Sequence, residues 1–166
     1  EVRNQARHAQ LSWAMVEQAL QERSDFDWND RVWIGLQSFA TAQANLSKLF
    51  FPIKHEPRAD LANAFGGVNL SPLRSRDLRD HFDHWDERIS AWLQTRGASP
   101  NSVQDRAIRA ESDIGMVPAP DQFRRFDPIS KLLIMRSRDG LSVERFELMP
   151  TVQCVNDILN TAANSP

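Results

Sequence analysis

The chain has 166 residues, of which 41% are hydrophobic and 25% are charged, a composition typical of a globular domain with its own core. Its net charge of −2 excludes a surface that holds nucleic acid by bulk electrostatics, so any nucleic-acid role must use a local site. The chain lacks the ~18 consecutive apolar residues of a membrane helix and the apolar core of a secretory signal.

These features predict a single cytoplasmic domain over residues 1–166 with no membrane segment. Cys154 is the only cysteine, so no disulfide can form within the chain and no cysteine-based zinc site can be built from it alone. None of the histidines forms the i, i+4 pair around a glutamate that a helical zinc protease uses; they are His8, His55, His81 and His84. We expect neither a metal nor a cofactor.

A first amphipathic helix is predicted over about 1–23. Apolar residues alternate there at spacings of four and three, which places them on one side of a helix: Val2, Ala6, Ala9, Trp13, Val16 and Leu20. The segment 24–27 interrupts this pattern. Asp27 and Asp30 are expected to cap the free N–H groups at the start of the next helix.

The second helix is predicted over about 27–50, ending before Pro52. The same spacing continues through Trp28, Val32, Gly35, Phe39, Ala42, Leu46 and Leu49. Two long helices joined by a short turn most simply form an antiparallel hairpin. Gly35, within the apolar seam, would allow the two helices to approach closely.

A third helix is predicted over about 72–95, after a connector that holds a possible short helix at 59–65. Ser71-Pro72 gives a helix-start signal, and Gly97 follows as a stop residue. The expected core stripe comprises Leu78, Phe82, Trp85, Ile89 and Trp92.

Beyond the third helix, the pattern predicts a long surface loop over 98–123. The arginine pairs Arg106/Arg109 and Arg124/Arg125 could face RNA or a partner there, but scattered charges of both signs favour plain solvated surface. Residues 131–148 indicate a β-hairpin around the Asp139-Gly140 turn, and 150–162 indicate a closing helix. The predicted fold is therefore mainly α: an up-and-down helical bundle with a small C-terminal β-hairpin and a closing helix.

The third helix carries a polar line at i, i+4 spacing. Its members are Arg76, Asp80, His84 and Arg88. On a continuous helix the Asp80 carboxylate would reach the His84 imidazole, and an imidazole beside a carboxylate can act as an acid or base near neutral pH.

An arginine, a polar residue directly after it and a histidine five positions after the arginine form the signature Arg-polar-x-x-x-His. This pattern, at Arg79, Asp80 and His84, resembles the HEPN superfamily of helical domains. The surrounding Leu-Arg-Asp-x-Phe-Asp-His-x-Asp-Glu-Arg also resembles a group of uncharacterised bacterial HEPN-like proteins, in which Asn commonly follows the arginine and Glu precedes the histidine. The close resemblance covers about a dozen residues.

The resemblance implies a HEPN-like fold and a metal-independent endoribonuclease of the toxin or phage-defence type, acting as a homodimer with a composite cleft. His84 would be the general acid or base, Arg79 would hold the scissile phosphate, and Asp80 would orient His84. Arg76 and Arg88 are the expected RNA-binding residues. The implied partners are a second copy of the chain, the RNA substrate and a cognate antitoxin or regulatory protein.

Other interpretations remain open. The same spacing occurs three residues earlier, in Arg76-Asp77-x-x-x-His81, but the Arg79–His84 copy also matches the flanking residues. The structural alternative for Arg79, Asp80 and His84 is a solvated helix face joined by ion pairs. Asp in place of the usual Asn adds negative charge beside a phosphate site. The alternative function is a noncatalytic HEPN-like module that binds a protein or a nucleotide.

Overall fold

A computed structural model describes residues 1–53, 58–96, 105–110, 123–139 and 142–164. The protein is mainly helical, with a small four-stranded sheet and a C-terminal helix. It divides into two compact units: the first contains Glu1–Asp80 with Met149–Pro166, and the second contains His81–Leu148. The single domain over 1–166 stays a prediction. No helix within the described ranges has the length and apolar content needed to cross a membrane.

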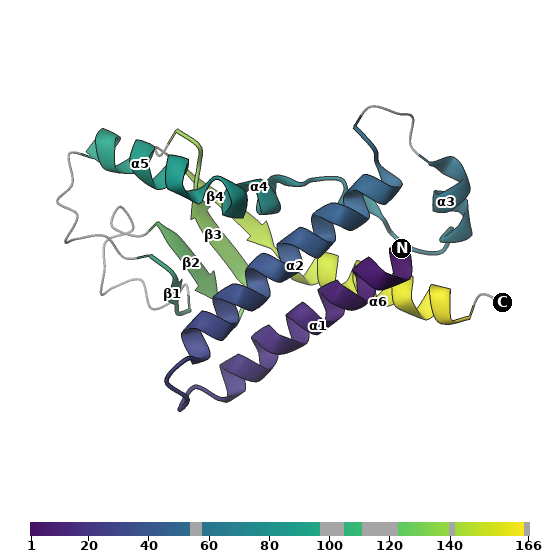
Figure 1. The fold of residues 1–166 in the computed structure, drawn as a ribbon, viewed down its shortest axis with the longest axis horizontal. Helices are drawn as coiled ribbons and strands as arrows, with labels where there is room; N and C mark the ends of the chain where they lie inside the picture. The colour runs from purple at the N-terminus through teal and green to yellow at the C-terminus, as the bar shows by residue number, and fades with distance from the viewer. Residues whose placement is uncertain (54–57, 97–104, 111–122, 140–141, 165–166) are drawn as a thin grey trace. The chain divides into compact units, whose positions relative to one another are not determined.

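An antiparallel helical hairpin forms the centre of the first unit (Figure 1). Its helices are α1 (Val2–Gln21) and α2 (Trp28–Phe50), so the two predicted helices are confirmed to within two residues at each end. The apolar stripes meet along the hairpin, where Trp13 packs against Phe39 with ring centroids 5.6 Å apart. Asp27 occupies the N-cap position of α2, but its side chain makes no capping hydrogen bond. It lies instead near Arg31, with Oδ1 3.5 Å from Nε.

The close approach expected at Gly35 is confirmed. A Cβ atom at this position would lie 2.7 Å from Val16 Cγ2 and 3.0 Å from the Ser12 carbonyl oxygen. Both distances are shorter than ordinary van der Waals contact, and the second involves backbone that cannot rotate away. The absence of a side chain at Gly35 therefore sets the separation of α1 and α2.

The closing helix α6 (Met149–Ala163) packs against α1 in the same unit, which confirms the helix predicted at 150–162. Arg3 donates a hydrogen bond to the Ala162 carbonyl near the end of α6. The buried side chains of α6 repeat at helical spacing: Val152, Cys154, Val155, Ile158 and Ala162. The short helix α3 (Ala59–Ala64) also lies where the connector was expected to form one.

The prediction of one continuous helix over 72–95 is wrong. The segment forms a 3-10 turn, η1 (Ser71–Leu73), followed by α4 (Asp77–Asp83) and α5 (Trp85–Arg96). The first break has a clear tertiary cause: Gln43 on α2 donates a hydrogen bond of 2.7 Å to the Ser75 carbonyl. Because this carbonyl points toward α2, it does not serve as an acceptor within a continuing helix. The Ser75 side chain then accepts the Asp77 N–H at the start of α4.

The second unit contains a four-stranded sheet in the order β1-β2-β3-β4. The strands are β1 (Ala107–Ile108), β2 (Arg124–Asp127), β3 (Leu132–Arg136) and β4 (Val143–Glu147). The β1–β2 pair is parallel, and the other two pairs are antiparallel. The hairpin predicted at 131–148 is confirmed as β3–β4, although Gly140 of its predicted turn lies outside the described residues.

Two strands were missed by the sequence analysis. β1 lies inside the predicted 98–123 loop, whose remaining residues are mostly outside the described ranges, and β2 directly follows it. Strands of two and four residues carry too few side chains for a periodic pattern to identify them. The helix α5 contacts the sheet at β3, and Trp92 stacks on Phe123 with centroids 5.5 Å apart.

The second unit buries charged side chains within this sheet. The expectation that Arg124 and Arg125 are solvated is wrong, because both are buried in β2. Arg124 forms a two-pronged ion pair with Asp105, with Nε–Oδ1 and Nη2–Oδ2 distances of 2.8 and 2.5 Å. Burial lowers the pKa of Arg125, and the neighbouring charge of Arg109 lowers it further.

Candidate functional site

The Arg-polar-x-x-x-His residues lie on α4 and just beyond its end. Arg79 and Asp80 belong to this helix, while His84 occupies the turn between α4 and α5. The continuous helix that was expected to face Asp80 toward His84 therefore ends one residue before the histidine. The catalytic roles of Arg79, Asp80 and His84 stay a prediction.

His84 is solvent-exposed, and a carboxylate lies beside it. Its Nδ1 atom is 3.5 Å from Oε1 of Glu87, and 56% of the histidine side chain is exposed. This separation makes the contact a loose ion pair when the imidazole is protonated, and it leaves the ring accessible. The i, i+3 spacing of Glu87 from His84 was a signal for this pair, but the sequence analysis assigned the neighbouring carboxylate to Asp80.

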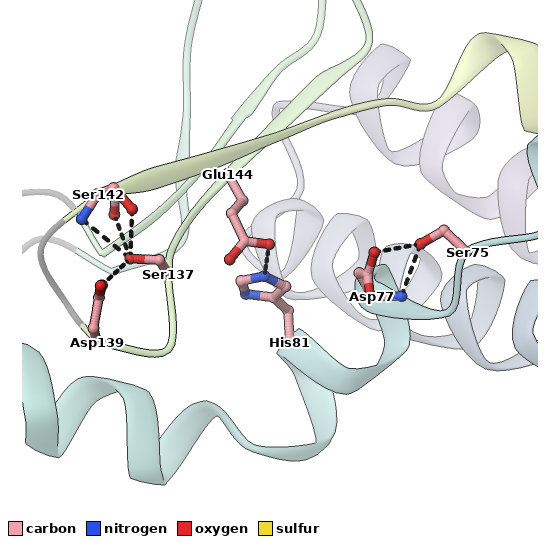
Figure 2. A network of polar contacts seen from close by, with 7 residues as sticks. All are labelled: Ser75, Asp77, His81, Ser137, Asp139, Ser142 and Glu144. Carbon is pink, nitrogen blue, oxygen red and sulfur yellow. Dashed lines mark hydrogen bonds and ion pairs between the residues drawn. The ribbon is translucent and has the colours of Figure 1, made fainter.

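His81, by contrast, is buried at 1% exposure. Figure 2 shows its Nε2 atom bonded to Oε2 of Glu144 on β4, a distance of 2.7 Å. The imidazole also meets Phe146 edge-on, with ring centroids 5.1 Å apart. A buried imidazole bonded to a partly exposed carboxylate on another element is typical of a histidine with a structural role. The sequence does contain a sign of this burial: His81 follows Leu78 by three residues, which places it on the core side of α4.

The hairpin end of β3–β4 holds a second polar group in the same unit (Figure 2). Ser137 Oγ donates to Asp139 Oδ1 at 2.5 Å and accepts the Ser142 N–H at 3.1 Å. These bonds join the two strands where the chain reverses. They are a local turn structure of the kind that Ser and Asp commonly form.

The two arginines expected to bind RNA have different environments. Arg76 donates from Nε to Ser47 Oγ at 3.0 Å and from Nη2 to the Phe51 carbonyl, so its guanidinium ties the start of α4 to the end of α2. Arg88 on α5 is buried at 8% exposure. Its Nε and Nη1 atoms make no hydrogen bond with any residue in the described ranges.

The remaining charge near His84 is mostly negative. Asp80, Asp83, Asp86 and Glu87 are all exposed, while Arg79 is half-buried. Trp85 was expected in the core, yet 45% of it is exposed, and the Arg124 guanidinium lies 5.6 Å from the centre of its ring. The chain therefore presents an exposed imidazole among exposed carboxylates.

Cys154 is not a nucleophile in this fold. It is buried in α6, and burial raises the pKa of its thiol to about 11, with a smaller effect from Asp157. At neutral pH almost none of this side chain is the reactive thiolate. Within the described ranges, no three His, Cys, Asp or Glu side chains gather in a way that could hold a metal ion.

Comparison with known proteins identifies no relative of this chain. No protein-family model, curated protein or solved structure matches the chain. The functional argument therefore depends on the site residues themselves.

Proposed function

We propose that the protein is a metal-independent endoribonuclease in which His84 performs proton transfer. The observation that carries the proposal is the contrast between the two histidines that fit the Arg-polar-x-x-x-His spacing. His81 is buried and bonded to Glu144, whereas His84 is exposed with only a loose ion pair to Glu87. Only the Arg79–His84 copy offers a histidine that can reach a substrate.

The reaction would be an internal phosphoryl transfer within RNA. His84 would take the proton from a ribose 2′-hydroxyl, and the resulting oxygen would attack the adjacent phosphorus. The 5′-oxygen would then leave with a proton from a general acid. The products would be a 2′,3′-cyclic phosphate and a free 5′-hydroxyl, so no water or metal ion is consumed in this step.

Arginine would supply the positive charge that the phosphate requires. Arg79 would bind the scissile phosphate through its planar N–H groups. Arg88 was also expected to bind RNA, but only 8% of it is exposed and its Nε and Nη1 atoms are buried, so a phosphate could reach it only after the side chain moves. Glu87 would orient the His84 ring.

The proposed reaction requires a homodimer, because it needs both a base and an acid. One exposed histidine can act as the base, but the departing 5′-oxygen also requires an acid. His84 of the partner subunit would provide it if two copies of the motif face one cleft. This arrangement predicts that cleavage per chain falls when the protein is diluted below its dimer dissociation constant.

The test is cleavage of a mixed RNA pool by purified protein in excess chelator, followed by analysis of the new ends. We expect cyclic phosphate ends from the wild type and none from His84→Ala. His8→Ala is the matched control, since His8 is an exposed histidine on α1 with no assigned role. Activity in His84→Ala equal to that of His8→Ala would overturn the proposal.

A noncatalytic interaction module is the second candidate, and one observation favours it. The four exposed carboxylates near His84 repel an anionic substrate unless arginines compensate. If the wild type leaves RNA intact but binds a basic partner protein, and Asp83→Asn with Asp86→Asn weakens that binding, this acidic segment is the interaction surface. RNA cleavage by the wild type would exclude the noncatalytic role.

A further inference from the structure

A hollow of about 660 Å³ lies between α1 and α6 in the first unit. Figure 1 shows α6 lying against the N-terminal half of α1. The hollow is lined by Arg3, Asn4, Arg7, Gln10, Leu159, Asn160 and Ala163. It uses none of the residues in the proposed ribonuclease site. Its volume is within the range of small-molecule pockets, but it is a shallow hollow that is largely open to solvent.

The lining has the chemistry of an anion site. Arg3 and Arg7 stand four residues apart on one face of α1, where like charges repel each other. Three carboxamides accompany them, and none of the seven described lining residues carries a carboxylate. Because no carboxylate among the described lining residues offsets the charges of Arg3 and Arg7, the potential in the hollow is positive. A bound anion would reduce the repulsion between the two arginines.

Each of the two exposed arginines donates a hydrogen bond to a neighbouring group. Arg3 donates to the Ala162 carbonyl, and Arg7 Nη1 donates to Gln10 Oε1 at 2.7 Å. Gln10 Nε2 in turn lies 3.4 Å from Asn156 Oδ1 on α6. A guanidinium has five N–H donors, so each arginine keeps donors for a ligand after making these bonds.

We propose that this hollow binds the phosphate group of a small organic phosphate. Two guanidinium groups match the double negative charge of a phosphomonoester and can each bond two of its oxygens. Leu159 and Ala163 offer an apolar wall for the organic part of the ligand, while Asn4 and Asn160 offer hydrogen bonds to its polar groups.

The test is a titration of the full chain with inorganic phosphate and with phenyl phosphate, monitored by amide NMR shifts at constant ionic strength set with sodium chloride. We expect both to shift residues around the hollow, with phenyl phosphate binding more tightly because its ring contacts the apolar wall. Equal affinities would identify free phosphate as the ligand of the same site. No shift beyond that of chloride would overturn the proposal.

Substitutions at Arg7 test whether the phosphate binds in this hollow. Arg7→Gln removes the charge, and we expect a roughly tenfold to hundredfold loss of affinity, the effect of losing charged hydrogen bonds. Arg7→Lys keeps the charge but loses the planar pair of donors, so its affinity should be intermediate. The control is Arg58→Gln, an exposed arginine outside the hollow, with fold checked by circular dichroism. Full binding by Arg7→Gln would contradict the site.

Discussion

The two units of this protein both have apolar cores, but they differ in how many charged side chains they bury. Along the α1–α2 hairpin the buried residues are mostly apolar, with Phe39, Leu36 and Leu46 each at 1% exposure or less. The second unit also has an apolar core, with Phe126 and Leu133 at 0% exposure. In addition it buries charged or titratable groups: His81, Arg88, Arg124, Arg125, Asp127 and Arg136. Apolar packing depends on area and shape, whereas buried charge depends on particular partners. Both units should therefore respond to lost volume, and the second should respond to lost partners as well.

The largest expected effect is in the apolar core of the first unit. Phe39→Ala removes a fully buried ring and its contact with Trp13, and it should lower the free energy of unfolding by about 3–5 kcal/mol. Urea unfolding followed by circular dichroism measures this change. Ile34→Ala on the exposed face of α2 is the control and should change stability by less than about 0.5 kcal/mol. Similar losses in both variants would show that the hairpin is not the core.

The second prediction concerns the close approach of α1 and α2. Gly35→Ala should destabilise the first unit by about 1–3 kcal/mol, because the new methyl group overlaps Val16 and the Ser12 carbonyl. The helix propensity of alanine would oppose this by about 1 kcal/mol at most. Gly67→Ala provides the comparison, since a Cβ at that position meets nothing within 4 Å. A stabilised Gly35→Ala protein would disprove the tight helix contact.

The third prediction tests partner dependence in the second unit. A double-mutant cycle over His81→Ala and Glu144→Ala should give a coupling of about 1 kcal/mol, because each variant removes one side of the same hydrogen bond. Glu147→Ala, an exposed acid on the same strand, should show no coupling with His81→Ala. Additive effects of His81→Ala and Glu144→Ala would mean that this bond contributes nothing to stability.

The smallest expected effect lies at the exposed turn of the first unit. The pKa of Glu22 is below its ordinary value of 4.5, owing first to the hydrogen bond from Gln18 and then to that from Arg31. Arg31→Gln should raise this pKa part of the way toward 4.5, as measured by NMR titration. Because the folded pKa is depressed, the associated stability is present at neutral pH and is lost as the pH falls through the folded pKa. An unchanged Glu22 pKa would exclude an effect of Arg31.

The difference between apolar packing and dependence on particular partners also explains which features the sequence could predict. The stripes around Trp13 and Phe39 specified α1 and α2 because apolar periodicity records burial directly. The break at Ser75 could not be predicted, since it depends on Gln43 from another helix. Burial of His81 likewise depends on Glu144, which lies 63 residues away in the chain. For the candidate site, the role of His84 stays a prediction, and the carboxylate beside this histidine is Glu87 rather than the expected Asp80.

The most direct test of the account compares His84→Ala with His81→Ala for both RNA cleavage and stability to urea. We predict that His84→Ala keeps the wild-type unfolding midpoint and loses cleavage, because an exposed imidazole contributes chemistry rather than packing. His81→Ala should lower the midpoint. Cleavage that survives in a folded His84→Ala protein would contradict the central claim that the exposed histidine carries the activity.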